Sequence, residues 1–140
     1  MITLLTFPAS FTCPSHSPYC VTAMCLLQMA GEAWEPEFHD DPRKMPYGKL
    51  PVARIDGRVI PDSGNIQRAL EARGAEFYPG LSPLQKAHAH AVQRMAEESL
   101  SFGLIHERWM RDENWAVVRD VFFAAMPRPI RVFVTGRIRN

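Results

Sequence analysis

The chain has 140 residues, a length that fits one domain or one small domain with part of a second. Hydrophobic residues make up 46% of the chain and charged residues 22%, as in ordinary globular proteins. The formal net charge of +1 disfavours a protein that coats nucleic acid, because such proteins carry a clear excess of basic residues.

Cysteine content and hydropathy exclude further classes. The three cysteines are an odd number at close spacing and do not form the framework of a secreted disulfide-rich protein, so we expect a cytoplasmic location. The longest apolar stretch, residues 19–30, falls well short of the roughly 20 residues that span a membrane. The N-terminus lacks the basic region of a signal peptide. No cysteine or histidine spacing matches a zinc site, and we predict no metal.

The N-terminal part of the chain alternates strand and helix signals. Ile2–Phe7 is an apolar run with β-branched residues, which predicts a buried strand. After a loop, Ser17 is a good N-cap, Pro18 suits the first helical position and Gly31 ends the helix. This helix is apolar on nearly all sides, which predicts that it is buried. Trp34–His39 predicts a second strand.

A hairpin and a second helix complete this part. Asp56-Gly57 lies between two short β-rich runs, which is the strongest short-range signal of a hairpin. Capping residues then start a helix that Gly74 ends. The order over residues 1–74 is therefore β-α-β-β-β-α, an α/β domain. The signals are a loop over residues 40–49, strands at Val52–Ile55 and Arg58–Ile60, and a helix start at Pro61-Asp62-Ser63.

Beyond a linker at residues 75–82, the pattern is wholly helical. Apolar residues recur at spacings of three and four from Leu84 to Trp109, which predicts one long amphipathic helix of about seven turns. A second helix is predicted over Asp112–Met126, with Trp115 and Val118 among its inward residues, and a third begins at Pro129.

The tetrapeptide Ser17-Pro18-Tyr19-Cys20 carries the clearest chemical signal. It stands at a strand–loop–helix junction where glutaredoxins have Cys-Pro-Tyr-Cys, whose first cysteine is a nucleophile activated by the helix N-terminus. A serine hydroxyl without a neighbouring base is a poor nucleophile. It is a good hydrogen-bond donor, and it would stabilise the thiolate of a bound thiol. The alternative is that Ser17 only caps the helix.

Two further features suit a small peptide ligand. A cis bond before Pro51 would leave the backbone N–H and C=O of Leu50 free to pair with an extended peptide, and the alternative is a trans proline at a strand start. Asp62 and Ser63 at a helix start suit an α-amino acid group, because the helix end attracts a carboxylate and Asp62 accepts from an ammonium. The alternative is that both residues only cap the helix.

In their order and spacing, these segments resemble the glutathione transferase superfamily, and more narrowly its bacterial branch related to metaxin and failed-axon-connections proteins. The resemblance implies a thioredoxin-like domain at residues 1–74, the linker at 75–82 and an all-α domain at 83–140. The helical domain of the family continues past Asn140, so we expect the chain to be C-terminally truncated or a fragment. The segments that carry the resemblance are Ile2-Thr3-Leu4, Phe7-Pro8-Ala9, Ser17-Pro18-Tyr19-Cys20, Met29-Ala30-Gly31, Gly48-Lys49-Leu50-Pro51, Asp62-Ser63, Gln93-Arg94-Met95, Glu97-Glu98, Glu107-Arg108-Trp109 and Asp112-Glu113-Asn114-Trp115.

The resemblance implies that glutathione is the co-substrate, and it assigns roles to individual residues. Ser17 matches the serine or cysteine that activates the thiol. The binding residues that it implies are Leu50 and Pro51 for the cysteinyl backbone, Asp62 and Ser63 for the γ-glutamyl end, and Lys49, the weakest match, for the glycyl carboxylate.

Three residues near this motif are candidate auxiliaries. Cys13 lies in a loop where this branch usually carries an apolar residue, so it adds a thiol near the site. His16 either raises the local positive potential, acts as a base, or is an exposed loop histidine. Cys20 or Cys13 would be the reactive group of a glutaredoxin-like thiol oxidoreductase.

Three functions are therefore in competition. The first is a glutathione transferase of detoxification, which conjugates glutathione to a small hydrophobic electrophile or uses glutathione to reduce it. The second is a non-catalytic binding or scaffold protein like metaxin. The third, a thiol oxidoreductase, ranks last because serine occupies the nucleophile position. The resemblance also allows a homodimer, and we expect neither a nucleic-acid partner nor a membrane span.

Overall fold

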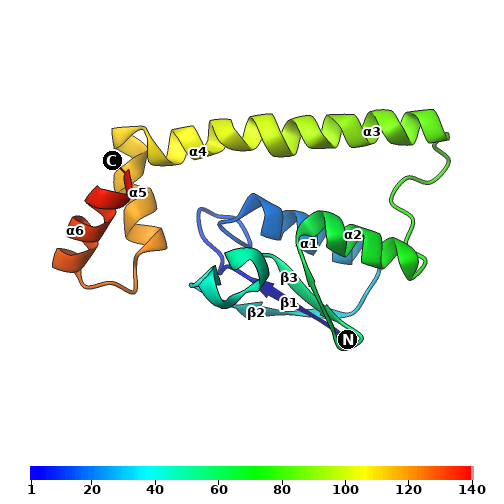
Figure 1. Ribbon diagram of the computed structural model, residues 1–140, viewed down its shortest axis with the longest axis horizontal. Coiled ribbons are helices and arrows are strands. Elements are labelled where there is room, and N and C mark those ends of the chain that lie inside the picture. The colour runs from blue at the N-terminus through cyan, green and yellow to red at the C-terminus, as the bar shows by residue number, and fades with distance from the viewer. Residues whose placement is uncertain (140) are drawn as a thin grey trace. The chain divides into compact units, whose positions relative to one another are not determined.

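The computed structural model describes residues 1–139, which divide into two compact units, one formed by residues 1–79 and one that begins at Gly80. In the first unit, a four-stranded sheet carries two helices in the predicted order β-α-β-β-β-α of a thioredoxin-like domain (Figure 1). The second unit is helical, which confirms the prediction of an α/β domain followed by an all-α region. The first unit contains β1 (Ile2–Thr6), α1 (Pro18–Met29), β2 (Trp34–Phe38), β3 (Val52–Ile55), β4 (Arg58–Pro61) and α2 (Ser63–Ala72).

The sheet has the strand order β2-β1-β3-β4. β1 runs parallel to β2 and antiparallel to β3, and β3 and β4 form the predicted hairpin. Asp56 and Gly57 at the turn have φ values of +50° and +75°, and two successive positive values are typical of a type I′ turn. The register places Leu5 opposite Val52 and Val52 opposite Pro61. The end of β1, the start of β3 and the end of β4 therefore lie side by side.

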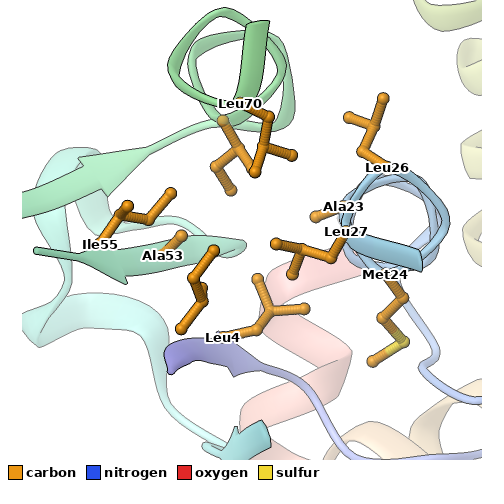
Figure 2. Packing of buried hydrophobic residues seen from close by; sticks show 10 residues of the cluster. Leu4, Ala23, Met24, Leu26, Leu27, Ala53, Ile55 and Leu70 are labelled. Atoms are coloured by element: carbon orange, nitrogen blue, oxygen red, sulfur yellow. The ribbon is translucent and has the colours of Figure 1, made fainter. Parts of the chain in front are cut away.

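Both helices pack on one face of the sheet. Figure 2 shows Leu4 of β1 and Ala53 and Ile55 of β3 beside Leu27 of α1 and Leu70 of α2. Successive side chains of a strand point to opposite faces, so alternate residues of β1 and β3 meet the helices. This cluster is the larger core of the first unit, and its buried members are Ile2, Leu4, Ala23, Met24, Leu26, Leu27, Ala53, Ile55, Ile66 and Leu70.

The prediction that α1 is buried on nearly all sides is wrong. Its inner side is buried, but Cys25 is exposed and Met29 is 66% exposed. The reason is geometric, because a helix that packs on one sheet face and beside one other helix buries only the side that meets them.

The connection between β2 and β3 is folded into two short turns. The 3-10 turns η1 (Pro42–Lys44) and η2 (Pro46–Gly48) span most of the segment predicted as loop. Met45, between them, packs with Phe7 against a second buried cluster. This cluster links the start of α1 to the start of β3, and its buried members are Leu5, Cys20, Leu50 and Val52.

In the second unit, the predicted long helix runs from Pro83 to Trp109. α3 (Pro83–Met95) and α4 (Ser101–Trp109) are joined by one π-helical turn, η3 (Ala96–Leu100). The apolar stripe that predicted this helix is not a buried face, since Leu84, Met95 and Phe102 are each 67% exposed. No helix within residues 1–139 combines the length and the apolarity that crossing a membrane requires.

Two shorter helices complete the second unit. In α5 (Asp112–Phe122), Trp115 and Val118 are buried as predicted. The ring of Trp115 lies 5.3 Å from that of Trp109, between ring centroids. An aromatic pair therefore joins α4 to α5.

The boundary between α5 and α6 (Arg128–Arg139) differs from the prediction. α5 ends at Phe122 rather than Met126, because Phe123 leaves the helical conformation with φ −115° and ψ 25°. The guanidinium of Arg131 in α6 donates to the carbonyls of Ala124 and Met126 at 3.0 and 2.9 Å. These bonds satisfy backbone groups in the segment between the helices.

Candidate functional site

The topology of the sheet brings Ser17, the Leu50–Pro51 segment and the Asp62-Ser63 helix start to one end of the sheet. Because β1 and β3 are antiparallel, the end of β1 lies beside the start of β3, and the hairpin returns the end of β4 to the same place. α1 begins at this end, the Leu50–Pro51 segment lies there, and so does the start of α2. The backbone N–H of Asp62 donates to the carbonyl of Pro51 at 3.1 Å, which joins two of the features directly.

Ser17 caps α1. Its Oγ accepts the backbone N–H of Cys20 at 3.4 Å, its own backbone is extended, and Pro18 follows at the first helical position. A hydroxyl oxygen that accepts one hydrogen bond still has its proton, so Ser17 can donate to a ligand at the same time. The N–H groups of the first helical turn add positive potential at this point. Capping and ligand activation are therefore compatible roles for this residue.

The three auxiliary candidates have different environments. Cys13 is exposed in a tight turn, where it pairs with Ser10 through two backbone hydrogen bonds of 2.9 and 3.1 Å. Cys20 is fully buried. His16 is also buried, with its ring centroid 4.6 Å from that of Phe7. The interpretation of His16 as an exposed loop histidine is therefore wrong, because packing against the Phe7 ring removes it from water.

The Leu50–Pro51 peptide bond is cis, which answers the question that the sequence left open. The side chain of Leu50 is buried with Cys20 and Val52, so this segment is held against the start of α1. Lys49, the preceding residue, is exposed.

Arg43, another cation in the connection between β2 and β3, forms an ion pair with Asp41. The guanidinium of Arg43 hydrogen-bonds both carboxylate oxygens of Asp41 and lowers the pKa of that carboxyl to about 2. The charge of Arg43 is thus balanced by Asp41, whereas Lys49 is the cation adjacent to Leu50. The carboxylate-binding role that the resemblance implies for Lys49 stays a prediction.

Asp62 and Ser63 begin α2 in different surroundings. Asp62 is the N-cap, and its Oδ1 accepts the backbone N–H of Gly64 at 2.9 Å. Its φ of +76° is uncommon for a residue with a side chain, although aspartate and asparagine adopt positive φ more readily than most. Asp62 is exposed and Ser63 is buried. The carboxylate of Asp62 is therefore the accessible member of the pair.

Two buried hydroxyl groups near Ser17 were not predicted from the sequence. Ser15 Oγ accepts the backbone N–H of Ser17 at 3.3 Å and lies 3.5 Å from Thr6 Oγ1. Thr6 and Ser15 were assigned only to a strand and to a loop. No spacing rule brings them together, because their contact depends on how the loop over residues 8–16 folds back onto the end of β1.

A comparison with protein families shows to which family the chain is related. The family model described as the glutathione S-transferase N-terminal domain matches residues 18–114, well over half of the chain. The chain belongs to the glutathione S-transferase superfamily. Within it, the curated relatives indicate the metaxin-like branch, as predicted. Metaxin-1 of Mus musculus is 35% identical over 104 residues, and Failed axon connections of Drosophila melanogaster is 27% identical over 115 residues.

Solved structures of glutathione transferases share the fold. A glutathione transferase homologue from Sulfitobacter, solved with bound glutathione, superposes with a TM-score of 0.57 at 17% identity, over 89% of this chain and 66% of that one.

The mouse Metaxin-1 match covers 71% of this chain but 32% of Metaxin-1, and the Drosophila match covers 81% of this chain but 28% of Failed axon connections. This glutathione transferase-like chain thus spans about a third of the length of these two curated relatives.

Proposed function

We propose that this chain binds glutathione and activates its thiol for conjugation to a small hydrophobic electrophile or for reduction of one. The observation that carries the proposal is the convergence of Ser17 at the start of α1, Leu50–Pro51 at the start of β3 and Asp62 at the start of α2. Glutathione is a short extended peptide with a zwitterionic end and a thiol, and it needs one contact of each kind.

Ser17 is the proposed catalytic residue. Its hydroxyl donates a hydrogen bond to the sulfur of glutathione, and the first turn of α1 contributes positive potential. Both interactions favour the thiolate over the thiol and so lower the pKa of the bound thiol. The thiolate is the nucleophile that attacks the electrophile.

The remaining residues hold the peptide. The backbone of Leu50 pairs with the cysteinyl residue in the manner of an added strand. The exposed carboxylate of Asp62 accepts from the γ-glutamyl ammonium, while the backbone N–H groups at the start of α2, that of Ser63 among them, meet the γ-glutamyl carboxylate. Lys49 attracts the glycyl carboxylate. The bound glutathione of the Sulfitobacter homologue supports this choice of ligand.

A second function is favoured by the curated relatives. The similarity to Metaxin-1 supports a non-catalytic binding or scaffold protein that retains the fold. The thiol oxidoreductase stays last, because Cys20 is fully buried and its thiol would have to be uncovered before it could attack a disulfide. The thiol of Cys13, the other cysteine of this hypothesis, is exposed in the loop before α1.

The setting of the protein is part of the proposal. Cys13, Cys20 and Cys25 form no disulfide, which suits a reducing cytoplasm. A homodimer, and a role in detoxification, are proposed from membership of the superfamily.

Calorimetric titration with reduced glutathione tests the binding site. Asp62→Asn keeps an acceptor for the cap and tolerates the positive φ, but removes the charge that meets the ammonium. We expect its affinity for glutathione to fall by roughly 10-fold or more, the value of a hydrogen bond to a charged group. Glu71→Gln, near the C-terminal end of the same helix, is the control and leaves the affinity unchanged. A folded wild-type protein that does not bind glutathione contradicts the proposal.

The ultraviolet absorbance of the bound thiolate, followed against pH, tests the role of Ser17. Ser17→Ala removes the donor to the sulfur, so we expect the pKa of the bound thiol to rise by about 1 to 2. Glutathione still binds through the other contacts. A thiol pKa that is equal in the wild type and Ser17→Ala shows that Ser17 is only a cap. Binding with a lowered thiol pKa but no turnover of any electrophile supports the scaffold function instead.

A further inference from the structure

We propose that Ser15 is a positioning residue for Ser17, holding the serine hydroxyl where it meets the sulfur of glutathione. This inference rests on the proposed function and adds a residue to the site. It assigns a role to a buried hydroxyl group that the mechanism above does not use.

The contacts of Ser15 connect the start of α1 to the sheet. Ser15 is 2% exposed, and its Oγ accepts the backbone N–H of Ser17 at 3.3 Å. On its other side lies Thr6, which is fully buried in the last position of β1, with 3.5 Å between the two hydroxyl oxygens. The Thr6 hydroxyl also donates to the carbonyl of Phe7 at 3.2 Å. A short polar chain thus runs from β1 to Ser17.

The loop that carries Ser15 is itself held in place. Two backbone hydrogen bonds close the turn between Ser10 and Cys13, and the backbone N–H of His16 donates to the carbonyl of Pro8 at 3.2 Å. Phe11 and Thr12 inside the turn both have positive φ. The loop therefore folds back on itself, which brings Ser15 to the end of β1.

Ser17 is consequently fixed from both sides. On the helix side, its Oγ accepts the N–H of Cys20, and on the sheet side its own N–H is bound by Ser15. Without Ser15, the N–H of Ser17 loses its partner in a partly buried position, and only the contacts on the helix side, with the N–H groups of Cys20 and Val21, still hold the residue. Activation by a single hydrogen bond depends on geometry within a fraction of an ångström, so loss of this support weakens activation more than binding.

The test is a double-mutant cycle read by the pKa of bound glutathione. We expect Ser15→Ala to raise the thiol pKa by a large part of the rise seen in Ser17→Ala, with less than a threefold change in glutathione affinity. If Ser15 acts through Ser17, the double variant Ser15→Ala/Ser17→Ala has the same thiol pKa as Ser17→Ala alone. Thr6→Val, which keeps the shape of the side chain and removes its hydroxyl, raises the pKa in the same direction by a smaller amount.

A matched control lies in the same loop. Ser10 Oγ is also buried but makes no hydrogen bond to the residues that the structure describes, so Ser10→Ala leaves the thiol pKa unchanged. Circular dichroism confirms that each variant is folded, and Thr6→Val takes the place of Ser15→Ala in the cycle if the latter does not fold.

The outcomes separate this inference from the proposed function. If the wild type fails to bind glutathione or to lower its thiol pKa, the proposed function is wrong and the inference falls with it. If the wild type does both and Ser15→Ala matches it, or if the two substitutions add in the double variant, only the positioning role is wrong. A rise in thiol pKa that vanishes in the Ser17→Ala background supports it.

Discussion

Arg73, at the C-terminal cap of α2, ties three segments together at the end of the sheet opposite the candidate site. Its Nε donates to Glu32 at 2.8 Å, and its guanidinium also pairs with Asp56 in the hairpin turn. The hydrogen bond from Arg73 holds the pKa of the Glu32 carboxyl below its usual value of 4.5. A single side chain therefore couples the segment before β2, the hairpin and α2.

Arg73→Gln tests the electrostatic part of this contact. Because the pKa of Glu32 is lowered in the folded state, its contribution to stability is complete above pH 4.5 and is lost as the pH falls through the lower folded value. We expect the urea midpoint of the wild type to exceed that of Arg73→Gln at neutral pH, with the difference shrinking under acid conditions. Arg68→Gln, whose guanidinium donates to Asn65 rather than to a carboxylate, is the control. A pH-independent difference would show that Arg73 acts by packing alone.

At the scale of elements, different parts of α1 position the candidate site and pack in the core. Its first turn carries Ser17 and Cys20 to the candidate site, and its middle supplies Ala23, Leu26 and Leu27 to the core. The exposed side does neither. The position of Ser17 thus depends on how firmly the buried side of α1 is packed.

Leu27→Ala and Met29→Ala separate the two sides of α1. Leu27 is fully buried in the core cluster, so its truncation leaves a cavity and is expected to lower the free energy of unfolding by about 2 to 5 kcal/mol. Met29 is exposed, and its replacement is expected to change that energy by roughly 0.5 kcal/mol or less. Urea unfolding followed by circular dichroism measures both. Equal losses would show that the exposed side of α1 is covered in solution.

At the scale of the whole molecule, the two units have separate cores. The two buried apolar clusters lie entirely within residues 1–79, whereas the buried apolar residues described in the second unit are Trp115 and Val118. The second unit itself does not cover the apolar stripe of its longest helix, which includes Leu84, Met95 and Phe102. The first unit therefore contains most of the apolar packing that stabilises the described residues.

A fragment of residues 1–79 is expected to fold without the second unit. Its sheet, both helices and both clusters are complete, so cooperative thermal unfolding should persist. Circular dichroism and a melting curve measure this, with Leu27→Ala in the fragment as a destabilised reference. A fragment without a cooperative transition would show that the first unit needs the second for its stability.

The amino-acid sequence by itself determined the elements of this protein, because their signals are local. Ser17 and Pro18 start α1, Asp56-Gly57 forms the hairpin turn, and Asp62 caps α2, each through contacts within a few residues. The order of these elements predicted an α/β domain, and the resemblance to the family identified its fold as thioredoxin-like. The residues proposed to bind glutathione were predicted from the sequence as well, through resemblance to the family.

Only the tertiary structure decided which surfaces are buried and which distant residues meet. The exposure of Met29, the burial of His16 and the contact of Ser15 with Thr6 depend on how loops and elements pack together, which no local spacing rule gives. The periodicity of apolar residues predicts that a helix has an apolar side, but it does not predict how much of that side another element covers. The meeting of Ser17, Pro51 and Asp62 likewise follows from strand register, which long-range pairing sets.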